Sequence, residues 1–380
     1  MVELTSAIID AVGGDPTARA QNFSPEVYNY DPAYLAKWRV ARSRVRAGDA
    51  RAKVATVGDS TTAGQGSGGS ALNSLRSRSY PAYLAKALAG SGIPARHDNI
   101  FGSSGFSTNY PLYEPRVTAN GWTPGSAISL GGTMYSTNGT TAFRYTATGS
   151  LVDTFIVYLA RNPGLGTVNI SIDGGAATSV ATAGTGGVIA QVITTTAGTS
   201  HYVEVARTTG GDVYIVGIEA YNSAVPDVAV LNVGSSGTRL GDWVANTNVG
   251  FSPLPALQVL APDLSIINLG INDWTQANVD VAAVKVQYQT LITGAKVSGD
   301  VIIVVPVPSQ ITRATVAQQA ALIAPMYDLA KTNNCVLIDM TRRFGSWATA
   351  NAGGFTYDDL HYNALGYADE AQTVCQMLLR

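Results

Sequence analysis

Val54-Ala55-Thr56-Val57 is a short apolar run that ends directly in Gly58-Asp59-Ser60. The next regular segment, Ser79–Ala89, has apolar residues at the spacing of one helix face. This part of the chain therefore predicts a buried strand, a turn and a helix. Because open α/β sheets bind ligands at the carboxyl ends of their strands, Ser60 stands where a reacting group is expected.

The same alternation of strand and helix returns in the last third of the chain. Short, nearly continuous apolar runs of this kind are typical of buried parallel strands. They are Val228–Val233, Leu264–Leu269, Val301–Val305 and Cys335–Asp339. Helices are predicted over Val281–Ala295, Thr315–Lys331 and Ala364–Leu379. The pattern predicts an α/β fold with a doubly wound, mostly parallel sheet.

The segment from 115 to 225 interrupts this alternation. It is rich in Gly, Thr, Ala and Ser, and Thr167–Asp173 alternates in polarity before Gly174-Gly175, which predicts a strand entering a hairpin. We therefore predict an all-β sandwich over 115–225, inserted into one catalytic domain formed by 51–114 and 226–380. Residues 1–50 are expected to be a lead-in segment with a helix over Asp31–Arg46.

The composition excludes several classes of protein. The 380 residues carry a net charge of −2, and no basic stripe suited to nucleic acid is present. No apolar run is long enough for a membrane span. The first residues lack the basic and apolar regions of a secretion signal. No nucleic-acid or membrane partner is expected, and the export route and oligomeric state stay open.

A general base for Ser60 has few candidates, because the chain has only three histidines. His97 and His201 lie in or near predicted strands. His361 lies in a loop directly before the final helix, three residues after Asp358. Such a loop can present the imidazole to a serine while the carboxylate orients the ring and stabilises the imidazolium.

Donors for a developing oxyanion follow two other predicted strands. Gly270-Ile271-Asn272-Asp273 ends an apolar run, and the Asn272 amide is a suitable donor. Asn232–Gly237 forms a glycine turn whose backbone N–H groups could supply a second one. Gly and Asn are also ordinary turn residues, so each motif alone is weakly specific.

Together these motifs resemble the SGNH/GDSL hydrolase superfamily, over about 50–112 and 226–380. The resemblance implies a flavodoxin-like α/β domain with Ser60 as nucleophile, His361 as base and Asp358 as its partner. It also implies an oxyanion hole formed by the Ser60 N–H, the Gly237 N–H and the Asn272 side chain.

A second glycine turn, Asn99–Gly105, also resembles the glycine block of this superfamily, and Gly105 competes with Gly237 for that role. We favour Gly237, because Asn232 precedes it by five residues and its distance to Asn272 along the chain suits the superfamily. Gly105 is then expected to shape the rim of the site or the junction with the insertion.

The inserted sandwich resembles the carbohydrate-binding-module-like domain that interrupts some bacterial carbohydrate O-acetylesterases. This resemblance implies a metal-free and cofactor-free serine esterase that removes O-acetyl groups from saccharides, acting outside the cell or on a virion. A broad short-chain esterase or lipase, and a glycan-binding or virion-tail protein on a hydrolase fold, are the alternatives. Six aromatic residues could stack on sugars, although most of them are expected to be core residues of the sandwich, and three aspartates could bind calcium. They are Trp122, Tyr135, Tyr145, Tyr158, Tyr202 and Tyr214, and Asp153, Asp173 and Asp212.

Overall fold

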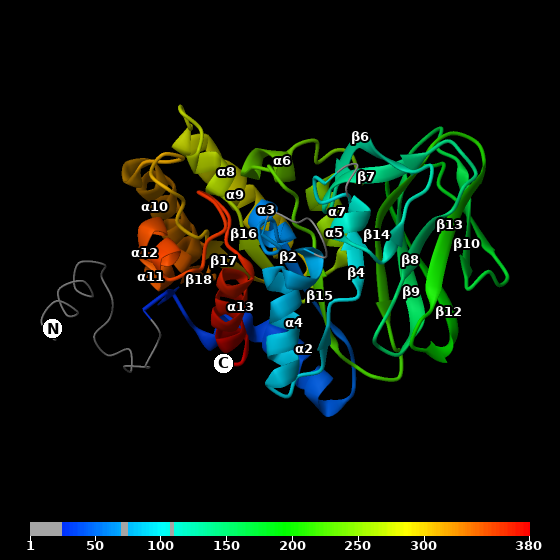
Figure 1. The fold of residues 1–380 in the computed structure, drawn as a ribbon, viewed down its shortest axis with the longest axis horizontal. Coiled ribbons are helices and arrows are strands. Elements are labelled where there is room, and N and C mark those ends of the chain that lie inside the picture. The colour runs from blue at the N-terminus through cyan, green and yellow to red at the C-terminus, as the bar shows by residue number, and fades with distance from the viewer. Residues whose placement is uncertain (1–24, 70–74, 107–109) are drawn as a thin grey trace, which may run out of the picture.

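A computed structural model describes residues 25–69, 75–106 and 110–380 (Figure 1). Its main sheet has seven strands in the order β1-β18-β17-β16-β2-β15-β3. All neighbours in this sheet are parallel except β1, which runs antiparallel to β18. The strands are β1 (Val27–Tyr28), β18 (Val336–Asp339), β17 (Asp300–Val305), β16 (Leu264–Asn268), β2 (Ala52–Gly58), β15 (Val228–Asn232) and β3 (Ala95–Arg96).

The register of the central strands places their carboxyl ends at one edge. Gly58 of β2 pairs with Asn268 of β16, and Thr56 pairs with Asn232 of β15. The loops that follow these three strands contain Ser60, Asn272 and Gly237. Parallel pairing alone therefore brings the three predicted site segments to the same edge of the sheet.

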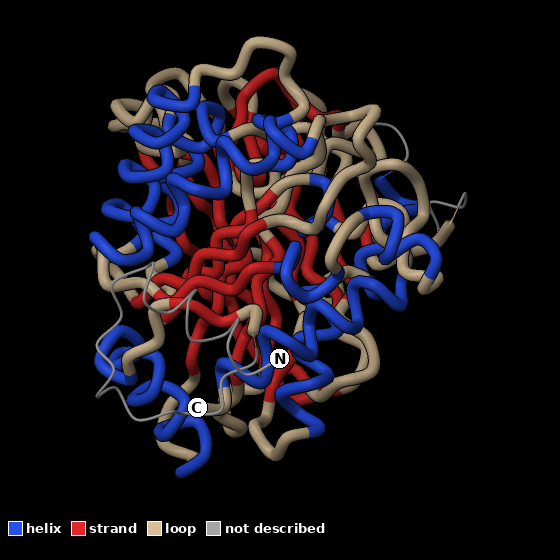
Figure 2. Tube along the Cα trace, turned by 90° about the vertical axis from the view of Figure 1, so that its left-hand side faces the viewer, coloured by secondary structure: helices blue, strands red, loops and turns tan. Residues whose placement is uncertain are grey.

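The helices of this domain lie around the strands of the main sheet (Figure 2). Their ends follow local signals: Thr315 and Gln318 form a capping box at the start of α10, and Asn363 caps α13. The helices are α2 (Ala36–Ala47), α3 (Ser60–Ala63), α4 (Tyr80–Gly90), α5 (Tyr110–Tyr113), α6 (Leu240–Val244), α7 (Pro253–Leu260), α8 (Ile271–Trp274), α9 (Val281–Ala295), α10 (Val316–Thr332), α11 (Met340–Phe344), α12 (Trp347–Ala352) and α13 (Ala364–Leu378). Two 3₁₀ turns cover Pro32–Leu35 and Leu75–Arg78.

Residues 117–221, here called the β-rich region, form two antiparallel sheets. One has the order β11-β10-β13-β8-β5 and the other the order β12-β9-β14-β7-β6. The strands are β5 (Val117–Thr118), β6 (Thr123–Ser129), β7 (Gly132–Thr137), β8 (Phe143–Thr146), β9 (Val152–Arg161), β10 (Thr167–Ile172), β11 (Thr178–Ala181), β12 (Gly187–Gly198), β13 (Tyr202–Thr209) and β14 (Val213–Tyr221). As the sequence pattern predicted, β10 and β11 pair across the Gly174-Gly175 turn.

Strand β9 is buried on both of its faces. Phe155, Val157 and Leu159 belong to the core of the β-rich region. The alternate residues Ile156 and Tyr158 belong to the core of the α/β domain. The β12-β9-β14-β7-β6 sheet is therefore shared between two cores.

The boundary between the two regions differs from the prediction. Strand β4 (Asn99–Phe101) falls in the segment assigned to the catalytic domain, yet it pairs with β14 of the shared sheet. The chain thus enters the shared sheet before residue 115 and returns to the main sheet at β15.

Four of the six aromatic candidates for sugar stacking are core residues, which is the more expected of their two roles. Trp122, Tyr135, Tyr145 and Tyr158 are buried, because they fill the cores on either side of the shared sheet. Tyr202 is half-buried, and the guanidinium of Arg144 lies 4.1 Å from the centre of its ring. Of the six aromatic candidates, Tyr214 is also half-buried.

No helix among the described residues combines the length and apolar character needed to cross a membrane.

Candidate active site

Ser60 is the first residue of α3, directly after β2, and it is buried. The Asp59 carboxylate caps this short helix by accepting the Thr61 N–H at 2.9 Å. Gly58 is required by close packing, since a Cβ there would lie 1.9 Å from Oγ1 of Thr62. The sequence Gly-Asp-Ser therefore ends the strand, caps the helix and holds the serine at the sheet edge.

The structure brings Ser60, His361 and Asp358 together. Nε2 of His361 lies 2.9 Å from Oγ of Ser60. Nδ1 of His361 lies 2.9 Å from Oδ2 of Asp358. With Nδ1–H donating to the carboxylate, Nε2 is left to accept the hydroxyl proton of Ser60. This arrangement can activate the serine as a nucleophile.

Asp358 also holds the loop that carries His361. Its Oδ1 accepts the backbone N–H of His361 at 2.6 Å and that of Leu360 at 2.8 Å. Burial raises the pKa of Asp358, but the hydrogen bonds from His361 outweigh burial and lower the pKa to about 2. The indole of Trp347 donates to the Asp358 carbonyl at 2.9 Å, a support that no sequence motif indicated.

Three candidate oxyanion donors lie in the segments that follow β2, β15 and β16 at this edge of the sheet. The Ser60 N–H is the first of α3 and has no acceptor within the helix. The Gly237 N–H makes no hydrogen bond to any described residue. The Asn272 side chain uses one N–H to bind the Thr238 carbonyl at 2.9 Å, and its amide has a second. Gly270 begins this turn at φ +121°, a conformation that favours glycine.

The backbone N–H groups of Gly105 and Gly237 differ in their hydrogen bonding. The Gly105 N–H donates to Oγ of Ser103 at 3.3 Å, whereas the Gly237 N–H is free to bind an external anion. Gly105 itself packs on Ser236, the residue before Gly237. This geometry favours Gly237 as the donor and places Gly105 beneath it.

A pair of buried carboxyl groups lies behind the nucleophile, and sequence reasoning missed one of them. Glu370 of α13 is fully buried and accepts the side-chain N–H of Asn268 at 2.7 Å. Burial, with a smaller contribution from Asp59, raises the pKa of Glu370 to about 8. Burial also raises the pKa of Asp59 to about 6, against the opposing hydrogen bonds from Thr61. The raised pKa therefore favours the protonated, neutral form of Glu370 near pH 7.

Gln65, another residue that the motifs did not indicate, joins the parts of the site. Its backbone carbonyl accepts the Tyr367 hydroxyl at 2.6 Å, and its side chain accepts the Ser236 hydroxyl at 2.8 Å. A Cβ on the next residue, Gly66, would lie 3.0 Å from Cβ of His361. The loop that contains Gln65 and Gly66 therefore contacts both the loop that carries His361 and the glycine turn that ends in Gly237.

The remaining candidates lie elsewhere. His97 is half-buried, its Nδ1 lies 2.8 Å from the Val230 carbonyl oxygen, and desolvation of the ring lowers its pKa well below the usual range. His201 binds Asp173 in the β-rich region. Asp153 binds the Ser223 N–H and hydroxyl. In the described part of the chain, no three His, Cys, Asp or Glu side chains group in a way that could hold a metal ion.

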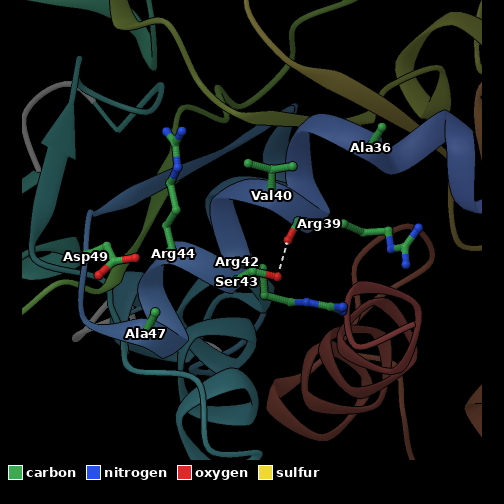
Figure 3. A pocket seen from close by; sticks show the side chains of 8 residues that line it. All are labelled: Ala36, Arg39, Val40, Arg42, Ser43, Arg44, Ala47 and Asp49. Carbon is green, nitrogen blue, oxygen red and sulfur yellow. Dashed lines mark hydrogen bonds between the residues drawn. The ribbon is translucent and has the colours of Figure 1, made fainter.

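A surface hollow of about 620 Å³, shown in Figure 3, is lined by α2 residues and Asp49. Helix α2 immediately precedes β2, whereas Ser60 follows it. The hollow therefore lies at the opposite end of the strand from Ser60 and forms no part of this site.

Residues 195–368 match the model of the GDSL-like Lipase/Acylhydrolase family. The predicted resemblance to GDSL hydrolases is confirmed. The matched segment contains Gly237, Asn272, Asp358 and His361, whereas Ser60 precedes it. No curated protein gives a significant match.

Solved structures also resemble this chain. One described as a peptidoglycan O-acetylesterase in action has a TM-score of 0.67 at 17% identity, covering 92% of this chain and 97% of that one. Family two carbohydrate esterases are also matched. That from Cellvibrio japonicus has a TM-score of 0.30 at 13% identity, covering 74% and 96% of the two chains. That from Clostridium thermocellum, in complex with cellohexaose, has a TM-score of 0.34 at 12% identity, covering 74% and 98%. The family match and the first structural match support an SGNH hydrolase fold, and the family match supports an ester hydrolase.

Proposed function

We propose that the protein is a serine esterase that removes O-acetyl groups from saccharides. The observation that carries the proposal is the hydrogen-bonded series from Asp358 through His361 to Ser60. The unoccupied Gly237 N–H supports it, because an ester hydrolase needs a donor for the oxyanion that forms during attack.

In the first step, Oγ of Ser60 attacks the carbonyl carbon of the acetyl ester, and Nε2 of His361 takes the hydroxyl proton. Asp358 stabilises the resulting imidazolium. The carbonyl oxygen becomes an oxyanion, which the N–H groups of Ser60, Gly237 and Asn272 bind. His361 then returns its proton to the departing sugar oxygen, leaving acetyl-Ser60 and a free sugar hydroxyl.

In the second step, a water molecule attacks the acetyl-Ser60 carbonyl while His361 takes one of its protons. The same donors bind the second oxyanion. When the acyl bond breaks, His361 returns the proton to Oγ of Ser60, and acetate leaves. Both steps use only groups that this chain supplies.

Support for a saccharide substrate comes from the similarity of the fold to a solved structure. The solved structure that resembles this chain along nearly its whole length is named as a peptidoglycan O-acetylesterase. We further propose that the β-rich region is a single sandwich inserted into a doubly wound domain, because strands β5 to β14 lie between β3 and β15 of the main sheet along the chain. Most of the candidate aromatic rings are buried, so they do not support sugar binding by the β-rich region.

The test is acetate release from 4-nitrophenyl acetate and from a panel of acetylated polysaccharides. Wild type is compared with Ser60→Ala and with Ser200→Ala, an exposed serine in the β-rich region. We expect release from a glycan that only Ser60→Ala abolishes. Release from the small ester alone would replace the saccharide assignment with a broad short-chain esterase or lipase. No release from any acyl ester would favour a binding or structural protein on a hydrolase fold.

A further inference from the structure

The two glycine turns, Gly102–Gly105 after β4 and Gly234–Gly237 after β15, have the same letters and lie side by side. The Ser236 N–H donates to the Ser104 carbonyl at 3.1 Å. A Cβ on Gly105 would lie 2.8 Å from Cβ of Ser236. The turn that ends in Gly237 therefore rests directly on the turn that ends in Gly105.

A third turn, Leu130–Gly132 between β6 and β7, binds both of them. The Gly131 carbonyl accepts the Ser104 N–H at 2.8 Å, and the Gly131 N–H donates to the Val233 carbonyl at 3.0 Å. Gly131 is thus hydrogen-bonded to the Gly102–Gly105 turn and to Val233, the residue directly before the Gly234–Gly237 turn.

This contact leaves no room for side chains. A Cβ on Gly132, which has φ +89°, would lie 2.2 Å from Oγ of Ser235. A Cβ on Gly131 would lie 1.9 Å from the Phe101 carbonyl oxygen. Gly131 packs against the backbone at the end of β4, and Gly132 packs against the Ser235 side chain of the Gly234–Gly237 turn.

The Leu130–Gly132 turn is itself firmly held. Leu130 and Met134 are buried in the core of the α/β domain. Thr133 accepts the Ser103 N–H at its carbonyl at 2.9 Å, and the hydroxyl groups of these two residues lie 2.7 Å apart. The turn therefore has a fixed position against which the glycine turns can be set.

Gly237 has no such support of its own. It is exposed, and the space where a Cβ would project is open. Its position depends on its neighbours: Ser236, which binds Ser104, and Thr238, whose carbonyl accepts the Asn272 side chain. Ser104, which accepts the first of these bonds, in turn donates its own N–H to the Gly131 carbonyl.

We infer that the Leu130–Gly132 turn is a positioning element that sets where the Gly237 N–H lies relative to Ser60. The β-rich region then acts in catalysis through its backbone. This inference rests on the proposed function, because it assigns a support to the oxyanion donor of that mechanism.

The test compares Gly132→Ala with Gly149→Ala in the full chain. Gly149 lies in the same region at φ +84°, with nothing within 4 Å of a Cβ, so this control carries the same backbone strain without the contact. Because loss of one oxyanion donor costs about 10²–10³ in kcat, we expect its displacement in Gly132→Ala to cost roughly 10- to 100-fold. KM for 4-nitrophenyl acetate should stay near that of Gly149→Ala.

A second readout separates positioning from a general structural effect. A small alkylboronic acid forms a tetrahedral adduct on Ser60 and places an oxygen where the oxyanion would lie. Its affinity should fall with kcat in Gly132→Ala and stay unchanged in Gly149→Ala. Adding Ser235→Ala to Gly132→Ala removes the nearest clashing atom and should restore part of kcat.

If Gly132→Ala does not fold, Thr133→Val tests the same support, because it removes only the hydroxyl contact with Ser103. A loss of about 2- to 5-fold in kcat without a change in KM is expected, since one neutral hydrogen bond contributes about 1 kcal/mol. Equal kcat in Gly132→Ala and Gly149→Ala, or in Thr133→Val and wild type, would overturn the inference. If Ser60→Ala abolishes turnover in the same assays, such a result leaves the proposed function standing.

Discussion

Asp358 binds His361 twice, through the ring Nδ1 at 2.9 Å and through the backbone N–H at 2.6 Å. One carboxylate thus fixes both the orientation of the imidazole and the shape of the loop that presents it. The two roles can be separated by substitution, because asparagine keeps an oxygen acceptor for the loop but loses the charge.

Asp358→Asn should lower kcat by about 10²–10⁴-fold, because its amide can donate to Nδ1 and stabilise the wrong tautomer of His361. The melting temperature should change less than in Asp358→Ala, which also loses the loop bonds. Steady-state kinetics with thermal unfolding checks both. An Asp358→Asn enzyme with full turnover would remove Asp358 from the mechanism.

Ser60→Ala should lower kcat by about three orders of magnitude or more, because the covalent step is lost. Among the described residues, the Ser60 side chain hydrogen-bonds only to His361. The unfolding temperature of the variant should therefore stay close to that of wild type. The measurement is kcat on 4-nitrophenyl acetate beside a thermal melt. A folded variant with unchanged kcat would mean that another group attacks the ester.

Asn272→Ala should lower kcat by about 10²–10³-fold if its amide binds the oxyanion. The substitution also frees the Thr238 carbonyl, so a comparison with Asn272→Asp is informative. Aspartate has nearly the same shape but no donor, and it should be at least as slow as alanine. An Asn272→Asp variant that matches wild type in kcat/KM would show that the amide donates nothing to the reaction.

Glu370→Gln tests the buried acid behind the nucleophile. The pKa of Glu370 is raised to about 8 from an ordinary value of 4.5, so between these pH values the folded state holds a proton that the unfolded state has lost. The free energy of unfolding of wild type should therefore fall as pH rises through this window, by up to about 1.4 kcal/mol per pH unit.

Glutamine cannot ionise, so the difference in unfolding free energy between Glu370→Gln and wild type should grow in favour of glutamine from pH 5 to pH 8. Urea unfolding at several pH values measures this difference. A difference that stays constant with pH would mean that Glu370 is ionised in the folded protein.

The site was largely predictable because its residues follow strands or precede a helix. Ser60 and Asn272 each follow a short apolar run, and parallel pairing brings such ends together. His361 and Asp358 are three residues apart, so one loop carries both. These relationships depend on local spacing and on the order of the strands, which a single sequence records.

Other features depend on contacts that no local pattern records. Glu370 lies on the final helix next to Asp369, and only the packing of α13 places it against Asn268. All three residues of strand β4 are buried. Their sequence does not indicate whether the strand pairs with a strand of the main sheet or with β14, its actual partner. The aromatic rings could be assigned to the core or to a sugar-binding surface only from the structure, because alternation predicts one solvent-facing side, whereas the shared sheet has two buried faces.

Because β9 contributes alternate side chains to two cores, neither region can be removed without uncovering the other. Excision of residues 117–221 would expose apolar surface of the α/β domain that Ile156 and Tyr158 now cover. The excised region would in turn expose the apolar surface that now packs against the α/β domain. For protein engineering, the β-rich region is therefore a poor candidate for grafting or exchange, and libraries of shortened variants should preserve β9 together with the strands beside it.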